Sequence, residues 1–261
     1  MHPVLIKIGS LEIHTYGFLL AIGFLLGIWI LSYNAKKFGL SSKKMVDFVF
    51  YVLIISLVGA KLFLFLSEFQ FYITNPKEIL NLLRAGGHFY GGLIFGILFS
   101  VWHLRKNNLP VLKTGDIVVP SLALGHAFGR LGCLSAGCCY GRPSNLFLSI
   151  IFSDPLASQN TGVPLGIPLY PTQLIEAIFN FLNFGFLFFL LKKRKYDGQV
   201  FFFYIINYSV ARFVLEYFRG DPDRGYLITG TSAFTSFSIP QFISSIGIIA
   251  SLLFFFYFRK K

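Results

Sequence analysis

The sequence predicts an all-α membrane protein with seven transmembrane helices, its N-terminus outside the cell and its C-terminus in the cytoplasm. Of the 261 residues, 55% are hydrophobic and 13% are charged, whereas about a quarter of the residues in a soluble domain are charged. The apolar residues also gather in seven long windows, and a helix needs about 20 such residues to cross a bilayer. The predicted spans are residues 16–33, 46–66, 89–104, 115–135, 172–191, 198–218 and 238–258.

The connections between these windows predict how the chain is organised. The N-terminal stretch lacks the basic region and small-residue cleavage site of a signal peptide, so the first span is expected to be retained. The span at 89–104 is short and rich in glycine, and such spans need other protein to cover them. Residues 136–171 hold five prolines, which predicts an irregular periplasmic arm with little helix. Residues 1–261 are expected to form a single polytopic domain.

The positive charge of the chain follows the membrane topology. The formal net charge is +12, and most lysines and arginines fall after spans one, three and five and at the C-terminus. Basic loops stay in the cytoplasm, and this rule sets the predicted orientation. Some of these residues are expected to attract anionic membrane lipids. The same distribution argues against a nucleic-acid partner.

Arg130 is a charged residue inside a predicted span, where insertion costs about 2.5–3.5 kcal/mol. It lies in the stretch GHAFGRLGC, next to Gly129 and close to Gly132. A guanidinium group among small residues suits a phosphate, which it grips with two hydrogen bonds, and a phospholipid is the nearest source of phosphate in a membrane. The alternative is an arginine whose side chain extends to the outer interface.

Arg212 and Glu216 lie four residues apart, so they share one face of the sixth predicted helix. One interpretation is an internal ion pair that orients this helix. The other is that Arg212 faces a polar cavity while Glu216 fixes its rotamer, and the two interpretations are compatible.

Two further clusters carry residues suited to binding or proton transfer. The stretch GGHFYGGLIFG contains His88, Tyr90, Gly91 and Gly92, and neutral histidine is poised near physiological pH. Its alternative is close helix packing with an interfacial aromatic pair. His14 and Tyr16 stand at the mouth of the first span, where interfacial tyrosine is ordinary.

The three cysteines of the chain are Cys133, Cys138 and Cys139, near the outer end of the fourth span. Disulfides are allowed on that side of the membrane, so the leading interpretation is a disulfide from Cys133 to Cys138 or Cys139. Inert packing is the second interpretation. A metal site is not expected, because zinc prefers four ligands and only His126 is nearby in sequence. No cofactor is expected.

Five segments then occur in a recognisable order: IHTYG, FYGGLIFG, GHAFGRLGC with GCCYGRPS, LYPTQLIEA, and ARFVLEYFRGDPD. Together they resemble the prolipoprotein diacylglyceryl transferases of bacterial inner membranes, over residues 13–223. The resemblance implies transfer of a diacylglyceryl group from phosphatidylglycerol to the lipobox cysteine of an exported prolipoprotein. It also implies that the partners are phosphatidylglycerol, the prolipoprotein signal peptide and membrane lipids.

The resemblance also implies roles for individual residues. Arg130 and Arg212 would hold the phosphate of the lipid, and Glu216 would support Arg212. Tyr16 matches a family tyrosine in the first span, and Gly141 matches a functional glycine in the arm. These residues imply a headgroup cavity that opens to the outer leaflet and is lined by spans one, three, four and six.

The chain departs from the family pattern at three positions. Tyr90 stands where the motif of the third span has histidine, Cys133 replaces an asparagine, and Cys138 replaces an acidic residue. The base that accepts the thiol proton is left open among His88, His14 and Tyr90. Two other functions are kept as alternatives: a membrane thiol–disulfide oxidoreductase and a non-catalytic phospholipid-binding paralogue.

Overall fold

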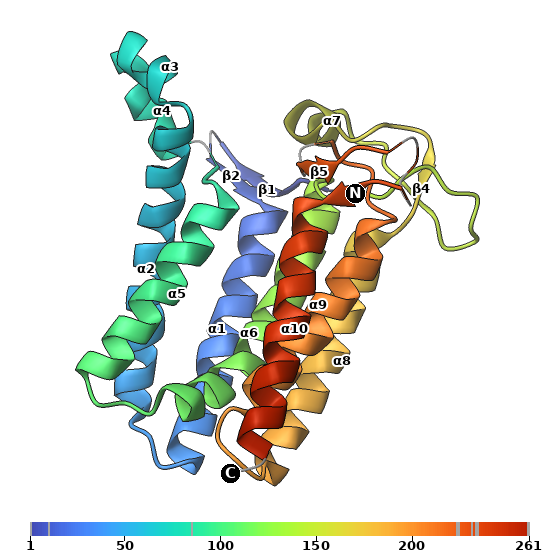
Figure 1. The fold of residues 1–261 in the computed structure, drawn as a ribbon. Coiled ribbons are helices and arrows are strands. Elements are labelled where there is room, and N and C mark those ends of the chain that lie inside the picture. Colours follow the sequence, from blue (N-terminus) through green and yellow to red (C-terminus); the bar gives the residue numbers. More distant parts are fainter. Residues whose placement is uncertain are drawn as a thin grey trace. The chain divides into compact units, whose positions relative to one another are not determined.

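The computed structural model describes residues 2–9, 11–84, 86–222, 225–230, 232 and 235–259, and Asp223, the last residue of the predicted match, lies outside them. Helices dominate the fold (Figure 1). The elements in chain order are β1 (Val4–Ile8), β2 (Leu11–His14), α1 (Thr15–Lys37), α2 (Ser42–Ser67), α3 (Phe69–Thr74), η1 (Pro76–Glu78), α4 (Ile79–Arg84), α5 (Phe89–Lys106), α6 (Val111–Ala136), β3 (Ile150–Ile151), α7 (Pro155–Thr161), β4 (Pro168–Leu169), α8 (Thr172–Lys193), α9 (Gln199–Glu216), β5 (Tyr226–Ile228), β6 (Phe237–Ser238) and α10 (Ile239–Arg259).

A long helix forms at each of the seven windows predicted as spans, namely α1, α2, α5, α6, α8, α9 and α10. Within the described residues, all of these except α5 and α9 are long and apolar enough to cross a membrane. Helices α5 and α9 have 18 residues each. They are therefore about 27 Å long, slightly less than the hydrocarbon core of about 30 Å. The membrane class and the mostly helical fold are confirmed.

The chain divides into two compact units, which are described separately. The first unit comprises the residues up to Ile30 and those from Gly115 onward, and the second comprises Leu31–Thr114. In the first unit α9 packs against both α8 and α10, and Figure 1 shows these three helices side by side. Helix α6 is joined to them by side-chain contacts, such as the edge-to-face pair of Phe128 and Phe181.

Short antiparallel strands lie at one end of the first unit, where α1, α8 and α10 begin (Figure 1). The β1–β2 hairpin leads directly into α1, and the Thr15 amide donates to the Pro3 carbonyl at 2.9 Å. None of the three strand pairs was predicted, because segments of two to five residues are too short for an alternating pattern to stand out. These short strand pairs are minor additions to a fold that is helical, as predicted.

The arm after α6 is irregular, as predicted, but it has a core of its own. Its helix α7 is capped by Asp154, whose Oδ1 accepts from the Leu156 amide at 2.9 Å. The helix ends at Gly162, whose φ of +70° is a left-handed conformation suited to glycine. The arm's buried apolar core is formed by Tyr140, Phe152, Ala157, Val163 and Leu169.

The opposite end of the first unit is fixed by Asp116 of α6, which is fully buried. Its carboxylate accepts from the amides of Gly198 and Phe201 at 2.8 and 2.9 Å, and Arg194 lies 3.4 Å away. A carboxylate at a helix N-terminus satisfies the free amides and the helix dipole. This acid at the end of a predicted span therefore joins α6 to the start of α9.

In the second unit α2 and α5 pack along glycines, as the packing interpretation of GGHFYGGLIFG predicts. A Cβ at Gly91 would overlap Phe63 and the Gly59 carbonyl, and one at Gly92 would lie 3.1 Å from the Ser56 carbonyl oxygen. The absence of side chains at these positions lets the two helix backbones approach closely.

Candidate functional site

Arg130 is held by two side chains in the interior of the first unit. Its Nε donates to His126 Nε2 at 3.2 Å and lies 3.1 Å from Glu176 Oε1. His126 is one helical turn earlier on α6, whereas Glu176 comes from α8 and is 2% exposed. Both of these contacts are made by Nε of Arg130. A buried guanidinium needs such a countercharge.

Glu176 connects three helices. Besides Arg130, its Oε1 accepts from the Tyr208 hydroxyl of α9 at 3.4 Å and lies 3.6 Å from His126 Nε2. The rings of His126 and Tyr208 are also in contact, with centroids 5.0 Å apart. In a low-dielectric interior such connected polar groups strengthen one another and define a single arrangement.

Arg212 forms the ion pair that the sequence predicted. Its Nη2 lies 2.9 Å from Glu216 Oε2 one turn later on α9, and Glu216 is 2% exposed. The Nη1 atom of Arg212 is buried and has no hydrogen-bond partner among the described residues. A buried donor without an acceptor costs free energy, so this nitrogen is suited to an anionic ligand.

The two arginines influence the same polar side chains. The charges of Arg130 and Arg212 both act on His126 and on Tyr208. Each arginine also has a carboxylate of its own, Glu176 or Glu216. The first unit thus places two cationic groups around one polar centre in an otherwise apolar interior.

Tyr16 lies at the start of α1, next to the C-terminal end of α6. It is 39% exposed, and a Cβ added at Gly132 would lie 2.9 Å from its Cδ2, so glycine is needed there for α1 and α6 to approach. His14 is exposed at the end of β2. A Cβ added at Gly129 would meet only Leu20, at 3.9 Å, so there is space beside this glycine. Of these residues, the structure brings Tyr16 and Gly132 into contact.

Gly141 is at the junction of the arm with the end of α9. It pairs with Arg219 in an isolated antiparallel bridge, and a Cβ at this position would overlap the Tyr170 carbonyl. Arg142 Nε donates to the Arg219 carbonyl at 2.9 Å, and the Arg219 guanidinium forms two hydrogen bonds to Asp221 at 2.5 and 2.6 Å. Burial tends to lower the pKa of Arg219, but these hydrogen bonds outweigh it and raise the pKa.

The remaining predicted residues lie in the second unit. His88 precedes α5, its amide donates to the Ala60 carbonyl at 3.0 Å, and its Nδ1 is buried without a hydrogen-bond partner in the described ranges. The His88 ring lies 5.9 Å from the ring of Tyr90 and 5.0 Å from that of Phe63. The structure therefore brings His88 and Tyr90 together, beside the packed Gly91.

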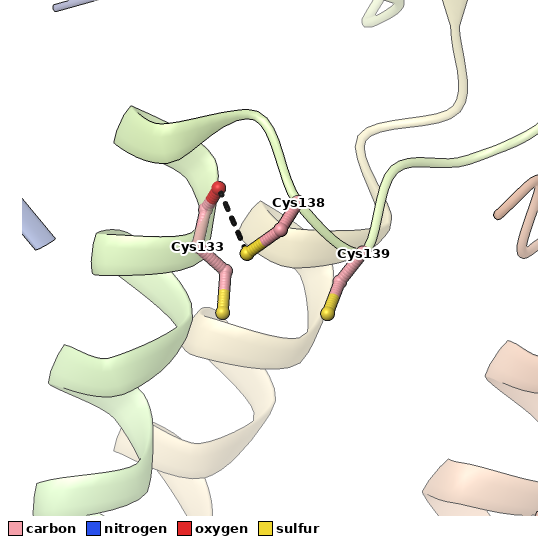
Figure 2. A group of neighbouring side chains, drawn as sticks. All are labelled: Cys133, Cys138 and Cys139. Atoms are coloured by element: carbon pink, nitrogen blue, oxygen red, sulfur yellow. Dashed lines mark hydrogen bonds between the residues drawn. The ribbon is translucent and has the colours of Figure 1, made fainter. Parts of the chain in front are cut away.

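The three cysteines are free thiols, which corrects the disulfide interpretation. Their sulfur atoms lie within 4.8 Å of one another, and Figure 2 shows Cys133 on α6 facing Cys138 and Cys139 on the segment that follows. Hydrogen bonds with Cys133 and Cys138, together with the charges of Arg219 and Arg130, lower the pKa of Cys139 despite burial. Hydrogen bonds with the other two thiols raise the pKa of Cys138.

The sequence analysis assigned no role in the site to three of its members: His126, Glu176 and Tyr208. A signal existed for each one. Glu176 is an acid inside an apolar window, His126 stands four residues before Arg130, and Tyr208 stands four residues before Arg212. Helical spacing places these last two on the same faces as the arginines.

The fold and the site define a class of protein. It is a helical membrane protein with a buried cationic centre, and this centre lies near the end of the helices from which the arm extends. Residues 3–257 match the family described as prolipoprotein diacylglyceryl transferase. The chain is 38% identical to the phosphatidylglycerol–prolipoprotein diacylglyceryl transferase of Clostridium tetani (strain Massachusetts / E88), over 90% of this chain and 92% of that protein. It is 35% identical to transferase 2 of Clostridium perfringens (strain 13 / Type A), over 92% and 91% of the two chains. It is 32% identical to the transferase of Staphylococcus carnosus (strain TM300), over 99% and 91%.

These matches extend over nearly the whole chain. The chain belongs to the prolipoprotein diacylglyceryl transferase family.

Proposed function

We propose that this protein transfers the diacylglyceryl group of phosphatidylglycerol to the cysteine thiol of exported prolipoproteins, the first step of lipoprotein maturation. The names of its relatives support this reaction and its two substrates. The thiol–disulfide oxidoreductase and the non-catalytic paralogue are not favoured by these relatives.

One observation carries the proposal from the family to this site. Arg212 has a buried Nη1 without a hydrogen-bond partner among the described residues. It stands one turn after Tyr208, whose hydroxyl donates to Glu176, the partner of Arg130. Two guanidinium groups in an apolar interior are suited to a phosphate diester. Glu176 and Glu216 orient them without removing every donor.

The reaction is a substitution at a glycerol carbon. The substrate sulfur forms a bond to the terminal carbon of the diacylglyceryl group, and the bond from that carbon to the phosphate oxygen breaks. The thiol proton goes to a base, and glycerol phosphate leaves with the bonding electrons. Negative charge grows on the leaving phosphate, and Arg130 and Arg212 stabilise it as preorganised cations.

The other predicted residues take supporting roles in this proposal. Tyr16 and His14, at the entrance of α1, contact the substrates. Gly132 and Gly141 let α1, α6 and the arm pack closely, and Gly129 leaves space for a substrate. His88, His14 and Tyr90 are the candidate bases. His88 has a buried, unpaired Nδ1 within the described residues, which favours it. Replacing His88 by Gln and Tyr90 by Phe separately, with a pH–rate profile for each, assigns the role.

The membrane arrangement is part of the same proposal. The chain forms one polytopic domain in the bacterial inner membrane, with seven spans, an external N-terminus and a cytoplasmic C-terminus. The basic residues in alternate connections support this orientation. Helices α5 and α9, which have 18 residues each, cross as the third and sixth of these spans.

Reconstitution tests the proposed function directly. The purified protein is placed in vesicles containing phosphatidylglycerol, with a peptide that carries a lipobox cysteine. The expected products are a thioether-linked peptide, detected by mass, and released glycerol phosphate in equal amount. Vesicles of phosphatidylcholine alone are the control for the donor. Absence of both products in the phosphatidylglycerol vesicles would contradict the proposal, and oxidation of the peptide thiol instead would support the oxidoreductase.

A further inference from the structure

The three thiols at the end of α6 form a cluster that the transfer reaction does not use. Cys133 is on the last turn of α6, and Cys138 and Cys139 follow it across a tight turn (Figure 2). All three sulfur atoms lie within 4.8 Å of one another. A metal bound to sulfur at about 2.3 Å sets its ligands about 3.8–4.0 Å apart, so small side-chain rotations close the cluster around one ion.

The backbone is strained to bring the thiols together. Gly137 has a φ of +85°, which glycine adopts without strain. Cys139 has a φ of +60°, a left-handed conformation that a residue with a Cβ rarely adopts, so the strain is at Cys139. Such strain costs about 1–3 kcal/mol and persists where surrounding structure enforces it. Its effect here is to turn Cys139 back toward Cys133 instead of outward along the arm.

Buried side chains of α8 hold this turn in place. Thr172 Oγ1 donates to the Cys139 carbonyl at 3.0 Å, and Gln173 Nε2 donates to the Cys138 carbonyl at 2.9 Å. Thr172 and Gln173 are each 1% exposed. Two of the three ligand positions are thus fixed by hydrogen bonds from α8, and the third, Cys133, is fixed by helix α6. None of these constraints depends on an ion, which is the arrangement of a preorganised site.

We propose that Cys133, Cys138 and Cys139 form a three-thiolate site for one soft metal ion of the d10 class, such as Zn²⁺, Cd²⁺ or Cu⁺. Sulfur ligands select these ions over Mg²⁺ and Ca²⁺, which prefer oxygen. The charges of Arg130 and Arg219 act on Cys139 and offset part of the negative charge of three thiolates. The prediction that the cysteines form a disulfide is replaced by this site, which is independent of the transferase reaction.

Cadmium titration tests the site, with the full-length protein in reducing detergent solution. The chain has three cysteines in total, so any thiolate signal comes from them. The expected result is one Cd²⁺ per chain, with a thiolate-to-cadmium absorption band in the ultraviolet. Replacing Cys133, Cys138 or Cys139 by Ser is expected to weaken binding by about 100-fold or more in each case. Ser135→Ala, on the same turn of α6 as Cys133, is the matched control and keeps the affinity.

X-ray absorption of the Zn²⁺-loaded wild-type protein gives a second measurement that does not depend on variants folding. Three sulfur neighbours at about 2.3 Å are expected. Three results would each overturn the site: affinity retained in the triple serine variant, no metal binding by the reduced protein, or a zinc shell dominated by nitrogen and oxygen. Magnesium chloride at the same concentration is expected to leave the thiolate-to-cadmium absorption band unchanged, because thiolates bind Mg²⁺ poorly.

Discussion

The two buried arginine–glutamate pairs of the first unit are built in different ways. Arg212 and Glu216 stand one turn apart on α9, so their pair forms with the helix itself. Arg130 and Glu176 come from α6 and α8, so their pair exists only when these helices pack. The comparison shows that one arginine is positioned by secondary structure and the other by the tertiary fold.

The comparison predicts its largest effect at Arg130. Arg130→Ala is expected to reduce diacylglyceryl transfer in vesicles by about 100- to 1,000-fold, the usual loss when a donor to developing negative charge is removed. Arg105→Ala, which removes an exposed arginine at the end of α5, is the matched control and keeps full activity. Full activity of the Arg130 variant would remove this residue from the mechanism.

The second prediction compares how much stability the protein loses when each of the two carboxylates is removed. Glu176→Gln leaves the Arg130 guanidinium buried without its countercharge and is expected to cost about 3–5 kcal/mol. Glu216→Gln is expected to cost less, because α9 forms without this pair and Arg212 keeps its place on the helix. Thermal unfolding of both variants in the same nanodiscs measures the difference. Equal destabilisation would show that the Arg130–Glu176 pair contributes no more to stability than the Arg212–Glu216 pair.

A third effect concerns activity at Glu216. Glu216→Gln is expected to lower transfer by about 10-fold, since Arg212 loses the carboxylate that fixes its rotamer but keeps its charge. Glu216→Asp, which keeps the charge on a shorter side chain, is expected to recover part of this loss. An aspartate variant no better than glutamine would mean that geometry, rather than charge, decides.

The smallest effect is expected at Tyr208. Tyr208→Phe removes the hydroxyl that donates to Glu176 at 3.4 Å and keeps the ring against His126. The expected loss of stability is about 0.5–1.5 kcal/mol, with a change of a few fold in transfer rate. A loss as large as that of Arg130→Ala would assign Tyr208 a direct contact with the reacting groups.

Hydropathy was sufficient to predict the helices, because each long helix is a nearly continuous run of apolar residues. Helical spacing was sufficient for Arg212 and Glu216. The pairing of Arg130 with Glu176 depends on which faces of α6 and α8 meet, and local sequence does not encode that directly. The packing alternative for Gly91 was foreseen because small residues permit close helix approach in any partner arrangement.

The cysteines show a different limit. Their spacing permits a disulfide or a packing cluster, and the disulfide is preferred because the outer compartment allows it. A metal site is not expected from the sequence, because only His126 offers a further ligand nearby. The left-handed φ of Cys139 and the anchors from Thr172 and Gln173 come from contacts with α8, far along the chain. The short β1–β2 hairpin was missed because its strands are brief and precede a much stronger helical signal.

The central claim, that Arg130 and Arg212 bind the lipid phosphate, is tested most directly by solid-state NMR. Protein labelled with nitrogen-15 in its arginine side chains is placed in nanodiscs of phosphatidylglycerol, and nitrogen–phosphorus dipolar couplings are measured. The account predicts guanidinium nitrogens within about 4 Å of a lipid phosphorus, with the coupling reduced in Arg130→Lys and again in Arg212→Lys. Wild-type coupling that persists unchanged in the variant with both lysines would contradict it.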